Sequence, residues 1–319
     1  MAGPTHALAH RTIDTNGIRM HLAEQGTGPL VLLCHGFPES WYSWRHQLPA
    51  LAAAGFRAVA PDMRGYGQTD RPAAIDQYTV FHLVGDMVGV LDALGEAQAV
   101  VVGHDWGAPV AWHCALLRPD RFRAVVGMSV PFGGRGPGRS TLALRKASGE
   151  FFNYILYFQK PGAAEAELER DPRESLRRML VGVAGDAPLK QMPPKDSAFL
   201  PSLPDRSSLP AWLTDGDLDF YGAEFRRTGF AGGLNWYRNL DRNWELSAAL
   251  AGAKITVPAL FVAGTNDVVV ATRPQQMQAM PKLIPNLRKI ALVPGVGHWT
   301  QQEGPAEVNG ELISFLEGL

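Results

Sequence analysis

The chain has 319 residues, of which 46% are hydrophobic and 19% are charged, and both values are ordinary for a globular protein. Its 30 basic and 31 acidic residues give a formal net charge of −1, and no run of Lys or Arg stands out, so the composition speaks against a nucleic-acid partner. No apolar run approaches the roughly 18 residues that cross a bilayer, so no membrane partner is expected.

The two cysteines, Cys34 and Cys114, are too few for a disulfide framework. Both lie in apolar stretches, which predicts buried structural thiols. The first 14 residues, Met1–Asp14, lack the apolar core of a signal peptide. We therefore expect a cytoplasmic protein, and the sequence leaves its oligomeric state open, a homodimer included.

Strands and helices alternate over about the first 130 residues. Short, continuous apolar runs are typical of strands that are buried on both faces. Such runs predict strands at Pro29–Cys34, Arg57–Pro61, Ala97–Val102 and Ala124–Val130, with helices at Val80–Leu94 and around Trp112–Leu117. Alternation of this kind implies parallel strands joined by right-handed crossovers.

The strand pattern stops from about Phe132 to Leu250. Helical patterns rich in aromatic residues replace it at Leu142–Gln159, Ala163–Val183, Leu218–Arg227 and Leu234–Trp244, with a loop at Gln191–Pro210. Strands resume at Val257–Ala263 and Leu287–Leu292, and a last helix fits Pro305–Leu316. We predict an α/β fold: a mostly parallel central sheet with helices on both faces (residues 1–132 and 251–319), interrupted by a helical cap (residues 133–250).

Residues 103–107 (GHDWG) lie between the strand Ala97–Val102 and the next helix, with the spacing of a nucleophile elbow, G-x-Nu-x-G. The sharp turn strains the backbone of the central residue, and glycines on both sides relieve the crowding. An Asp at a helix start is often only an N-cap. As a nucleophile, however, Asp105 would leave an ester that water can cleave, which suits attack on a saturated carbon such as that of an epoxide or alkyl halide.

The order nucleophile, acid, histidine is typical of α/β-hydrolases. Only one histidine, His298, lies beyond His113, and it sits in a glycine-rich loop after a predicted strand. Asp267 follows the strand Val257–Ala263. We predict that His298 activates a water molecule and that Asp267 fixes its tautomer.

The segment 35–38 (HGFP) follows the first buried strand, at the sheet edge where this architecture places its site. The backbone N–H groups of Phe37 and Trp106 are predicted to form an oxyanion hole. His35 is interpreted as a histidine that hydrogen-bonds the loop, and Pro38 as a candidate for a cis peptide bond.

With these residues in place, the chain resembles the soluble epoxide hydrolases of the α/β-hydrolase superfamily, including the hydrolase domain of the vertebrate, plant and bacterial enzymes. The resemblance covers essentially the whole chain. The segments that carry it are HGFPESWYSWRHQ (35–47), DMRGYGQTD (62–70), GHDWGAPVAW (103–112), FNYILYFQKPG (152–162), GLNWYRN (233–239) and GHWTQ (297–301).

This resemblance implies hydrolysis of a small apolar epoxide to a vicinal diol through an ester on Asp105, without a metal or organic cofactor. It maps two cap tyrosines that hold the epoxide oxygen onto Tyr154 and Tyr237, whereas Tyr157 is assigned to packing. The predicted substrate pocket contains His35, Pro38, His104, Trp236 and Trp299, although the tryptophans fit a hydrophobic core as well.

Three alternatives share parts of this pattern. A haloalkane dehalogenase resembles the chain in fold and nucleophile, but it needs two N–H donors for the halide, and only Trp106 fits. A fluoroacetate dehalogenase would be expected to have GHDRG at the elbow, where this chain has Trp106 in place of the Arg. A non-catalytic hydrolase fold that binds a ligand would have no need of the intact set Asp105, Asp267 and His298.

Overall fold

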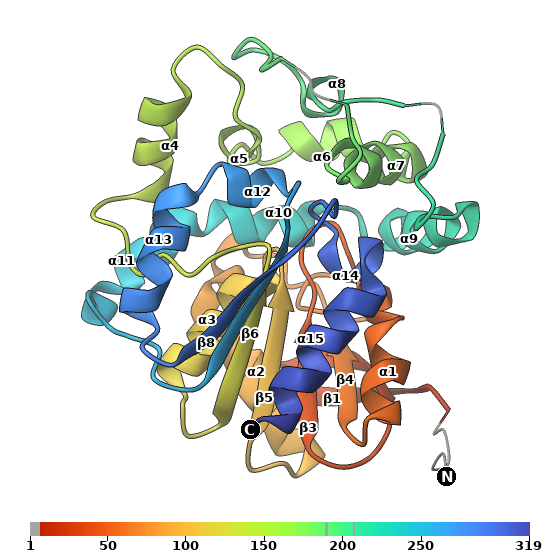
Figure 1. The fold of residues 1–319 in the computed structure, drawn as a ribbon. Helices are drawn as coiled ribbons and strands as arrows, with labels where there is room; N and C mark the ends of the chain where they lie inside the picture. The colour runs from red at the N-terminus through yellow and green to blue at the C-terminus, as the bar shows by residue number, and fades with distance from the viewer. Residues whose placement is uncertain (1–6, 189–190, 207) are drawn as a thin grey trace.

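The computed structural model describes residues 7–188, 191–206 and 208–319 and is built on one eight-stranded sheet (Figure 1). The strand order is β1-β2-β4-β3-β5-β6-β7-β8, and every pairing from β4 onward across the sheet is parallel, as predicted. The strands are β1 (Ala9–Thr15), β2 (Ile18–Gln25), β3 (Leu30–Cys34), β4 (Arg57–Pro61), β5 (Ala99–His104), β6 (Phe122–Met128), β7 (Ala259–Gly264) and β8 (Leu287–Val293).

Helices cover both faces of this sheet. On one face lie α1 (Gln47–Ala53) and α15 (Pro305–Glu317), and on the other lie α2 (Val80–Leu94) and α3 (Gly107–Leu117) (Figure 1). Each face has its own buried hydrophobic cluster. The predicted bounds of β4 and α2 are confirmed, and those of the other predicted strands and of α15 agree within two residues.

The N-terminal hairpin of β1 and β2 was not predicted. The two strands pair antiparallel, and β2 pairs antiparallel with β4. Asn16 and Gly17 form the turn between them, with φ of 44° and 78°. Asn-Gly between two extended runs is a strong hairpin signal, because both central residues of the favoured turn need positive φ.

The segment between β6 and β7 is helical, as predicted, but most of its helices are shorter than predicted. They are α4 (Ser140–Ser148), α5 (Tyr154–Tyr157), α6 (Ala163–Leu168), α7 (Pro172–Gly182), α8 (Phe199–Ser202), α9 (Asp215–Thr228), α10 (Ala231–Arg238) and α11 (Leu240–Leu246). They form an upper layer over the carboxyl ends of the strands (Figure 1).

The predictions of three long helices in this segment are wrong, because each of these stretches is divided into shorter helices. Gly149, with φ of 55°, ends the first part of Leu142–Gln159, and Asn153 caps the second. Asp171 caps a new helix within Ala163–Val183, and Asn239 divides Leu234–Trp244. The predicted loop Gln191–Pro210 contains α8, and its position 207 lies outside the described residues, as do the first six residues of Met1–Asp14.

Four short helices in the sheet-forming part were also missed, namely α1, α12 (Val268–Ala271), α13 (Pro274–Leu283) and α14 (Thr300–Glu303). None of the helices in the described part of the chain combines the length and apolar character that a bilayer crossing requires.

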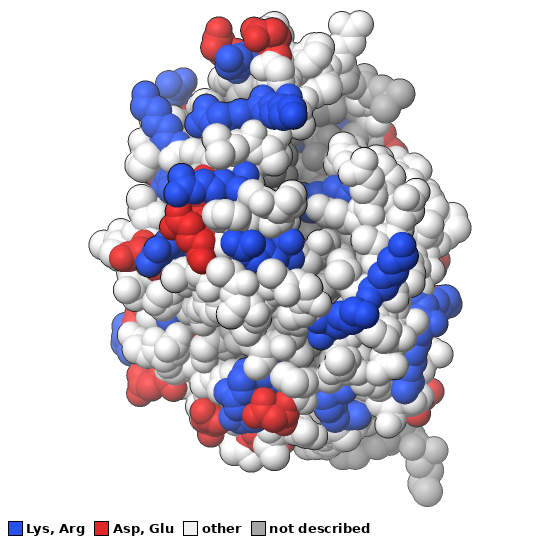
Figure 2. Space-filling view, turned by 90° about the vertical axis from the view of Figure 1, so that its left-hand side faces the viewer, with Lys and Arg blue, Asp and Glu red and all other residues white. Residues whose placement is uncertain are grey.

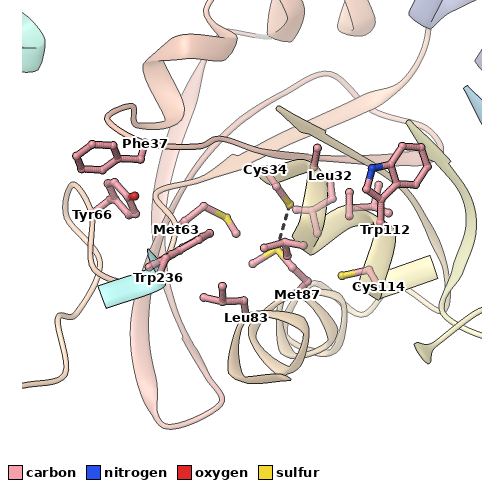
Figure 3. Close-up of a cluster of buried hydrophobic side chains, with 14 of the residues drawn as sticks. Leu32, Cys34, Phe37, Met63, Tyr66, Leu83, Met87, Trp112, Cys114 and Trp236 are labelled. Carbon is pink, nitrogen blue, oxygen red and sulfur yellow. Dashed lines mark hydrogen bonds between the residues drawn. The ribbon is translucent and has the colours of Figure 1, made fainter. Parts of the chain in front are cut away.

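A buried cluster beneath the carboxyl end of β3 contains both cysteines (Figure 3). Cys34 lies 3.4 Å from the sulfur of Met87, and Cys114 is carried by α3. Both thiols are free and buried, and burial raises the pKa of each. A raised thiol pKa disfavours the reactive thiolate, which agrees with the structural role predicted for both residues.

A buried ion pair ties the N-terminal hairpin to α2. The Arg64 guanidinium donates to both oxygens of Asp86, at 2.7 and 2.5 Å, and Asn16 in the hairpin turn donates to the same carboxylate at 2.9 Å. Both charged side chains are 1% exposed. Each charge therefore depends on the other for its solvation.

We expect Asp86→Ala to lower the free energy of unfolding by about 3–5 kcal/mol, because it leaves the Arg64 charge buried without a partner. Urea unfolding of the variant measures this loss. Asp92→Ala, on the same helix, is the matched control: Asp92 is 63% exposed in its pair with Arg121, so its loss should cost less than about 1 kcal/mol. Equal losses of unfolding free energy in the two variants would mean that burial of the Arg64–Asp86 pair does not increase its contribution to stability.

Candidate active site

Asp105 occupies the sharp turn between β5 and α3. Its φ is 50°, a left-handed conformation that strains a residue with a side chain, as expected for an elbow. The neighbouring backbone leaves no room for larger residues, since a Cβ on Gly103 would lie 2.0 Å from the carbonyl oxygen of Gly107. A Cβ on Gly107 would lie 2.0 Å from the carbonyl oxygen of Cys34. The glycines therefore permit the turn that presents the carboxylate.

His298 lies between two carboxylates at the carboxyl ends of three strands. Its Nε2 is 3.4 Å from Oδ2 of Asp105, and its Nδ1 is 3.2 Å from Oδ1 of Asp267. Asp267 follows β7 and His298 follows β8, so chain order and space agree. The three predicted residues are thus brought together, with Asp267 1% and His298 5% exposed.

The charges of this trio support one another. Burial alone would lower the pKa of His298, but Asp267 and Asp105 together raise it to about 10. Burial would raise the pKa of both carboxyls, yet the neighbouring imidazole lowers the pKa of each below its ordinary value. In this structure, therefore, a charged imidazolium lies between two carboxylates at neutral pH.

The segment 35–38 faces the elbow, as predicted. The N–H of Phe37 donates to Oδ1 of Asp105 at 2.8 Å, and the Phe37–Pro38 peptide bond is cis. Gly36 allows this approach, since a Cβ there would lie 2.4 Å from the Asp105 carboxylate. Trp106 is the residue directly after the nucleophile, where its N–H begins the first turn of α3.

A third buried carboxylate, Glu39, joins the three loops of the site and was not predicted. It accepts hydrogen bonds from the N–H of Gly36 (3.0 Å), from Nδ1 of His104 (2.9 Å) and from two glutamine side chains of α14. The other nitrogen of His104 lies 2.7 Å from the carbonyl oxygen of His298. His104 therefore connects Glu39 to the loop that carries His298.

Glu303 holds the loop that carries His298 and was likewise missed. Its carboxylate accepts from the N–H groups of Gly297 (2.9 Å) and Trp299 (3.0 Å), on either side of His298, and from Gly185 after α7 (2.8 Å). The N–H of His298 itself donates to the carbonyl of Val183 at 3.1 Å. The cap and the histidine loop are therefore connected through the backbone.

Both mapped tyrosines line a cavity of about 520 Å³ that reaches Asp105 and Trp106. The rings of Tyr154 and Tyr237 lie 6.0 Å apart, and the ring of Tyr237 lies 5.0 Å from that of Trp106. Burial raises the pKa of both phenols, that of Tyr154 to about 12. The two hydroxyls are therefore protonated at neutral pH and able to donate.

The five residues predicted for the pocket lie outside the lining of this cavity, namely His35, Pro38, His104, Trp236 and Trp299. The indole N–H groups of Trp236 and Trp299 donate to the carbonyls of Arg64 (3.1 Å) and Leu180 (2.7 Å), and both rings are core residues. A large aromatic residue in sequence does not reveal whether it faces a core or a cavity.

Two histidines and one tyrosine singled out in the sequence have structural contacts. Nε2 of His35 accepts from the N–H of Met63 at 3.0 Å, which fits a loop-holding role. His104 supports the site through Glu39 and was missed in that role. The hydroxyl of Tyr157 donates to Glu167 at 2.9 Å, which agrees with packing. Within the described ranges, no cluster of three or more His, Cys, Asp or Glu side chains is arranged to hold a metal ion.

Comparisons with known proteins agree with this arrangement. The chain matches the family model of the α/β hydrolase fold over residues 29–305. It is 49% identical to epoxide hydrolase A of Mycobacterium tuberculosis, a match that covers 100% of this chain and 99% of that protein. An epoxide hydrolase from an endophytic Streptomyces has a TM-score of 0.95 at 50% identity, over 98% of this chain and 96% of that one. Epoxide hydrolase A from Mycobacterium thermoresistibile has a TM-score of 0.94 at 50% identity, over 98% and 99% of the two chains.

The position of His298 between two carboxylates predicts a pH dependence. Because folding raises the pKa of His298 from 6.5 to about 10, the stabilisation that His298 gains decreases as pH rises above 6.5 and is lost as pH rises through about 10. In Asp105→Asn the pKa of His298 should fall, because burial still lowers it and one of the two carboxylates that raise it is gone. Histidine ring NMR titrations of both proteins measure the two values, and equal values would disprove the coupling.

Proposed function

The chain belongs to the epoxide hydrolases of the α/β-hydrolase fold, and we propose that it converts an epoxide to a vicinal diol through a covalent ester on Asp105. The observation that carries this mechanism is an ionised carboxylate on the elbow, 3.4 Å from a histidine and at the end of a cavity with two phenols. We also propose that the chain divides into a hydrolase core (residues 1–132 and 251–319) and a cap (residues 133–250).

In the first step, the Asp105 carboxylate attacks one ring carbon and the C–O bond of the epoxide breaks. Tyr154 and Tyr237 donate hydrogen bonds to the oxygen as it becomes negative, which protonated phenols are able to do. The oxygen gains a proton and the carboxylate becomes a neutral ester. A phenol that gives its proton to the epoxide oxygen is protonated again. His298 supplies that proton, so the imidazolium loses one proton in this step.

The second step follows from the change in charge. Ester formation removes the negative charge of Asp105, so the pKa of His298 falls and the ring can give up its proton and become a base. Neutral His298, oriented by Asp267, then takes a proton from water. The resulting hydroxide attacks the ester carbonyl, and the N–H groups of Phe37 and Trp106 stabilise the oxyanion. The bond between the carbonyl carbon and the substrate oxygen then breaks, and this oxygen takes the proton of the added hydroxyl. The diol leaves and Asp105 is restored as a carboxylate.

The proposed substrate is a small epoxide with apolar parts that fit the cavity. The cavity wall supports this view, because Trp106, Val110, Leu144 and Ile155 contribute to it. A cytoplasmic location also stays a prediction, and the two free, buried thiols are compatible with it.

Diol formation from a panel of aryl and alkyl epoxides, with haloalkanes beside them, tests the reaction. We expect diol from the wild type and none from Asp105→Ala. His298→Gln should still open the ring but accumulate the ester, so the denatured protein carries the added mass of the epoxide. Halide release without diol would instead favour a dehalogenase. Absence of an adduct with an epoxide that the wild type turns over would contradict the two-step scheme.

The two phenols should matter mainly for ester formation. We expect Tyr154→Phe with Tyr237→Phe to slow that step by about 10²–10⁴-fold, the usual contribution of positioned acids. Rapid-mixing experiments that follow tryptophan fluorescence measure it. Tyr157→Phe is the matched control, because its hydroxyl binds Glu167, and it should leave the rate close to that of the wild type. A double variant as fast as the control would remove both phenols from the mechanism.

A further inference from the structure

The histidine loop (residues 295–299) is held from two sides. On the side of the sheet, the carbonyl oxygen of His298 accepts from the hydroxyl of Ser129 at 2.9 Å and lies 2.7 Å from Nε2 of His104. On the side of the helical segment, the N–H of His298 donates to the carbonyl of Val183, directly after α7, at 3.1 Å. The backbone of the proposed base therefore depends on both parts of the chain.

The end of α7 and the histidine loop are in direct backbone contact. A Cβ on Gly185 would lie 2.3 Å from the carbonyl oxygen of Gly295 and 2.6 Å from the nitrogen of Gly297. A Cβ on Gly297 would in turn lie 2.1 Å from the nitrogen of Gly185. Neither Gly185 nor Gly297 has a positive φ, so close approach is the feature that requires glycine at these two positions.

Glu303 bonds to both of the crossing segments. Its Oε2 accepts from the N–H groups of Gly185 (2.8 Å) and Gly297 (2.9 Å), and its Oε1 accepts from the N–H of Trp299 (3.0 Å). The N–H of Glu303 also donates to the carbonyl of Trp299 at 2.8 Å, so α14 continues directly from the histidine loop. One side chain thus connects both neighbours of His298 to the end of α7.

Backbone N–H groups, and not a cation, compensate the carboxylate of Glu303. Many Lys and Arg side chains of this chain lie at the surface, as Figure 2 shows for the side of α4 and α13. Within the described part of the chain, no Lys or Arg forms an ion pair with Glu303, and burial raises its pKa. Such a carboxylate is costly, but both of its oxygens accept, so it can serve all three donors.

Other elements hold the groups that open the ring. Asp105 lies on the elbow between β5 and α3, where the N–H of Phe37 donates to its carboxylate at 2.8 Å. Tyr154 belongs to α5 and Tyr237 to α10. The nucleophile and the two phenols are therefore carried by elements other than α7 and α14, which hold the histidine loop.

We propose that Glu303 and residues 183–185 form a clamp that positions His298 for hydrolysis of the ester. The inference rests on the proposed function and deepens it, since it assigns positioning residues to the second step. In that step His298 must direct a water molecule at the ester carbonyl, and a displacement of about 1 Å can cost about 100-fold in rate. Ring opening depends less on the exact position of the imidazole, because Asp105 forms the bond to carbon and the phenols hold the oxygen.

Glu303→Gln tests the clamp, because the amide NH2 cannot accept and at least one of the three N–H groups loses its partner. We expect the decay of the ester to slow by about 10- to 100-fold and its formation by less than about threefold. Rapid quenching of single turnovers, followed by mass spectrometry of the denatured protein, measures both rates. Glu303→Asp keeps both acceptors and should restore part of the decay rate. Glu307→Gln, at an exposed position of α15, is the matched control.

Gly185→Ala separates position from charge. The added Cβ pushes on the histidine loop, whereas the charge of Glu303 stays in place. We therefore expect this variant to slow ester decay more than ester formation, as Glu303→Gln does. Gly216→Ala on α9 is the matched control, because a Cβ there would have its nearest neighbour at 3.6 Å, an ordinary contact.

The ratio of the two rates decides the outcome. Equal slowing of ester formation and decay in Glu303→Gln would overturn the proposal, and so would unchanged rates. A selective effect in Glu303→Gln that is absent from Gly185→Ala would also overturn it, since the charge of Glu303 alone would then act on His298. If Glu303→Gln does not fold, Glu303→Asp and Gly185→Ala decide by the same ratio. A wild type that forms no ester would refute the proposed function itself.

Discussion

One imidazole between two buried carboxylates is the interaction on which the rest of the site depends. Removing Asp105 and Asp267 from water would favour their neutral forms, and removing His298 from water would favour its neutral form. Together, the three groups keep each other charged. A nucleophile that is ionised although it is buried follows from this arrangement. So does a base whose strength depends on whether the nucleophile carries its charge.

Holding carboxylates from two other loops within 3.4 Å of His298 requires support from outside the trio. Glu39 and Glu303 supply it, each by accepting several hydrogen bonds from the backbone or side chains of the loops. Both are carboxylates that act as acceptors and take no part in the proposed reaction. A buried carboxylate with a full set of donors is rigid, because every bond that breaks leaves a charge unsolvated.

The sequence reveals those features that a local rule determines. Strands β3 and β5 are buried on both faces, so their apolar runs stand out, and the order Asp105, Asp267, His298 follows the order of strand ends. The hairpin at Asn16-Gly17 also had a local signal, which was overlooked. The divided cap helices depend on caps such as Asn153 and Asp171, which are weak signals beside long amphipathic patterns.

Long-range contacts were harder to predict. Glu39 reaches His104 across 65 positions and the glutamines of α14 across more than 260, and no motif links such residues. The two tryptophans that fitted pocket or core alike are buried and lie outside the described cavity lining. The sequence did not separate the two positions, because hydrophobicity predicts burial but gives no direction.

The charge of the cavity follows from the same balance of buried groups. Asp105 and His298 together are neutral before ring opening, and they are neutral again once the ester has formed and the imidazole has lost its proton. Arg135 and Arg273 also line the cavity and take no part in this exchange. The Asp267 carboxyl, whose pKa His298 lowers, keeps its charge through both steps. His298 therefore has a carboxylate beside it both when it gives up a proton and when it takes one.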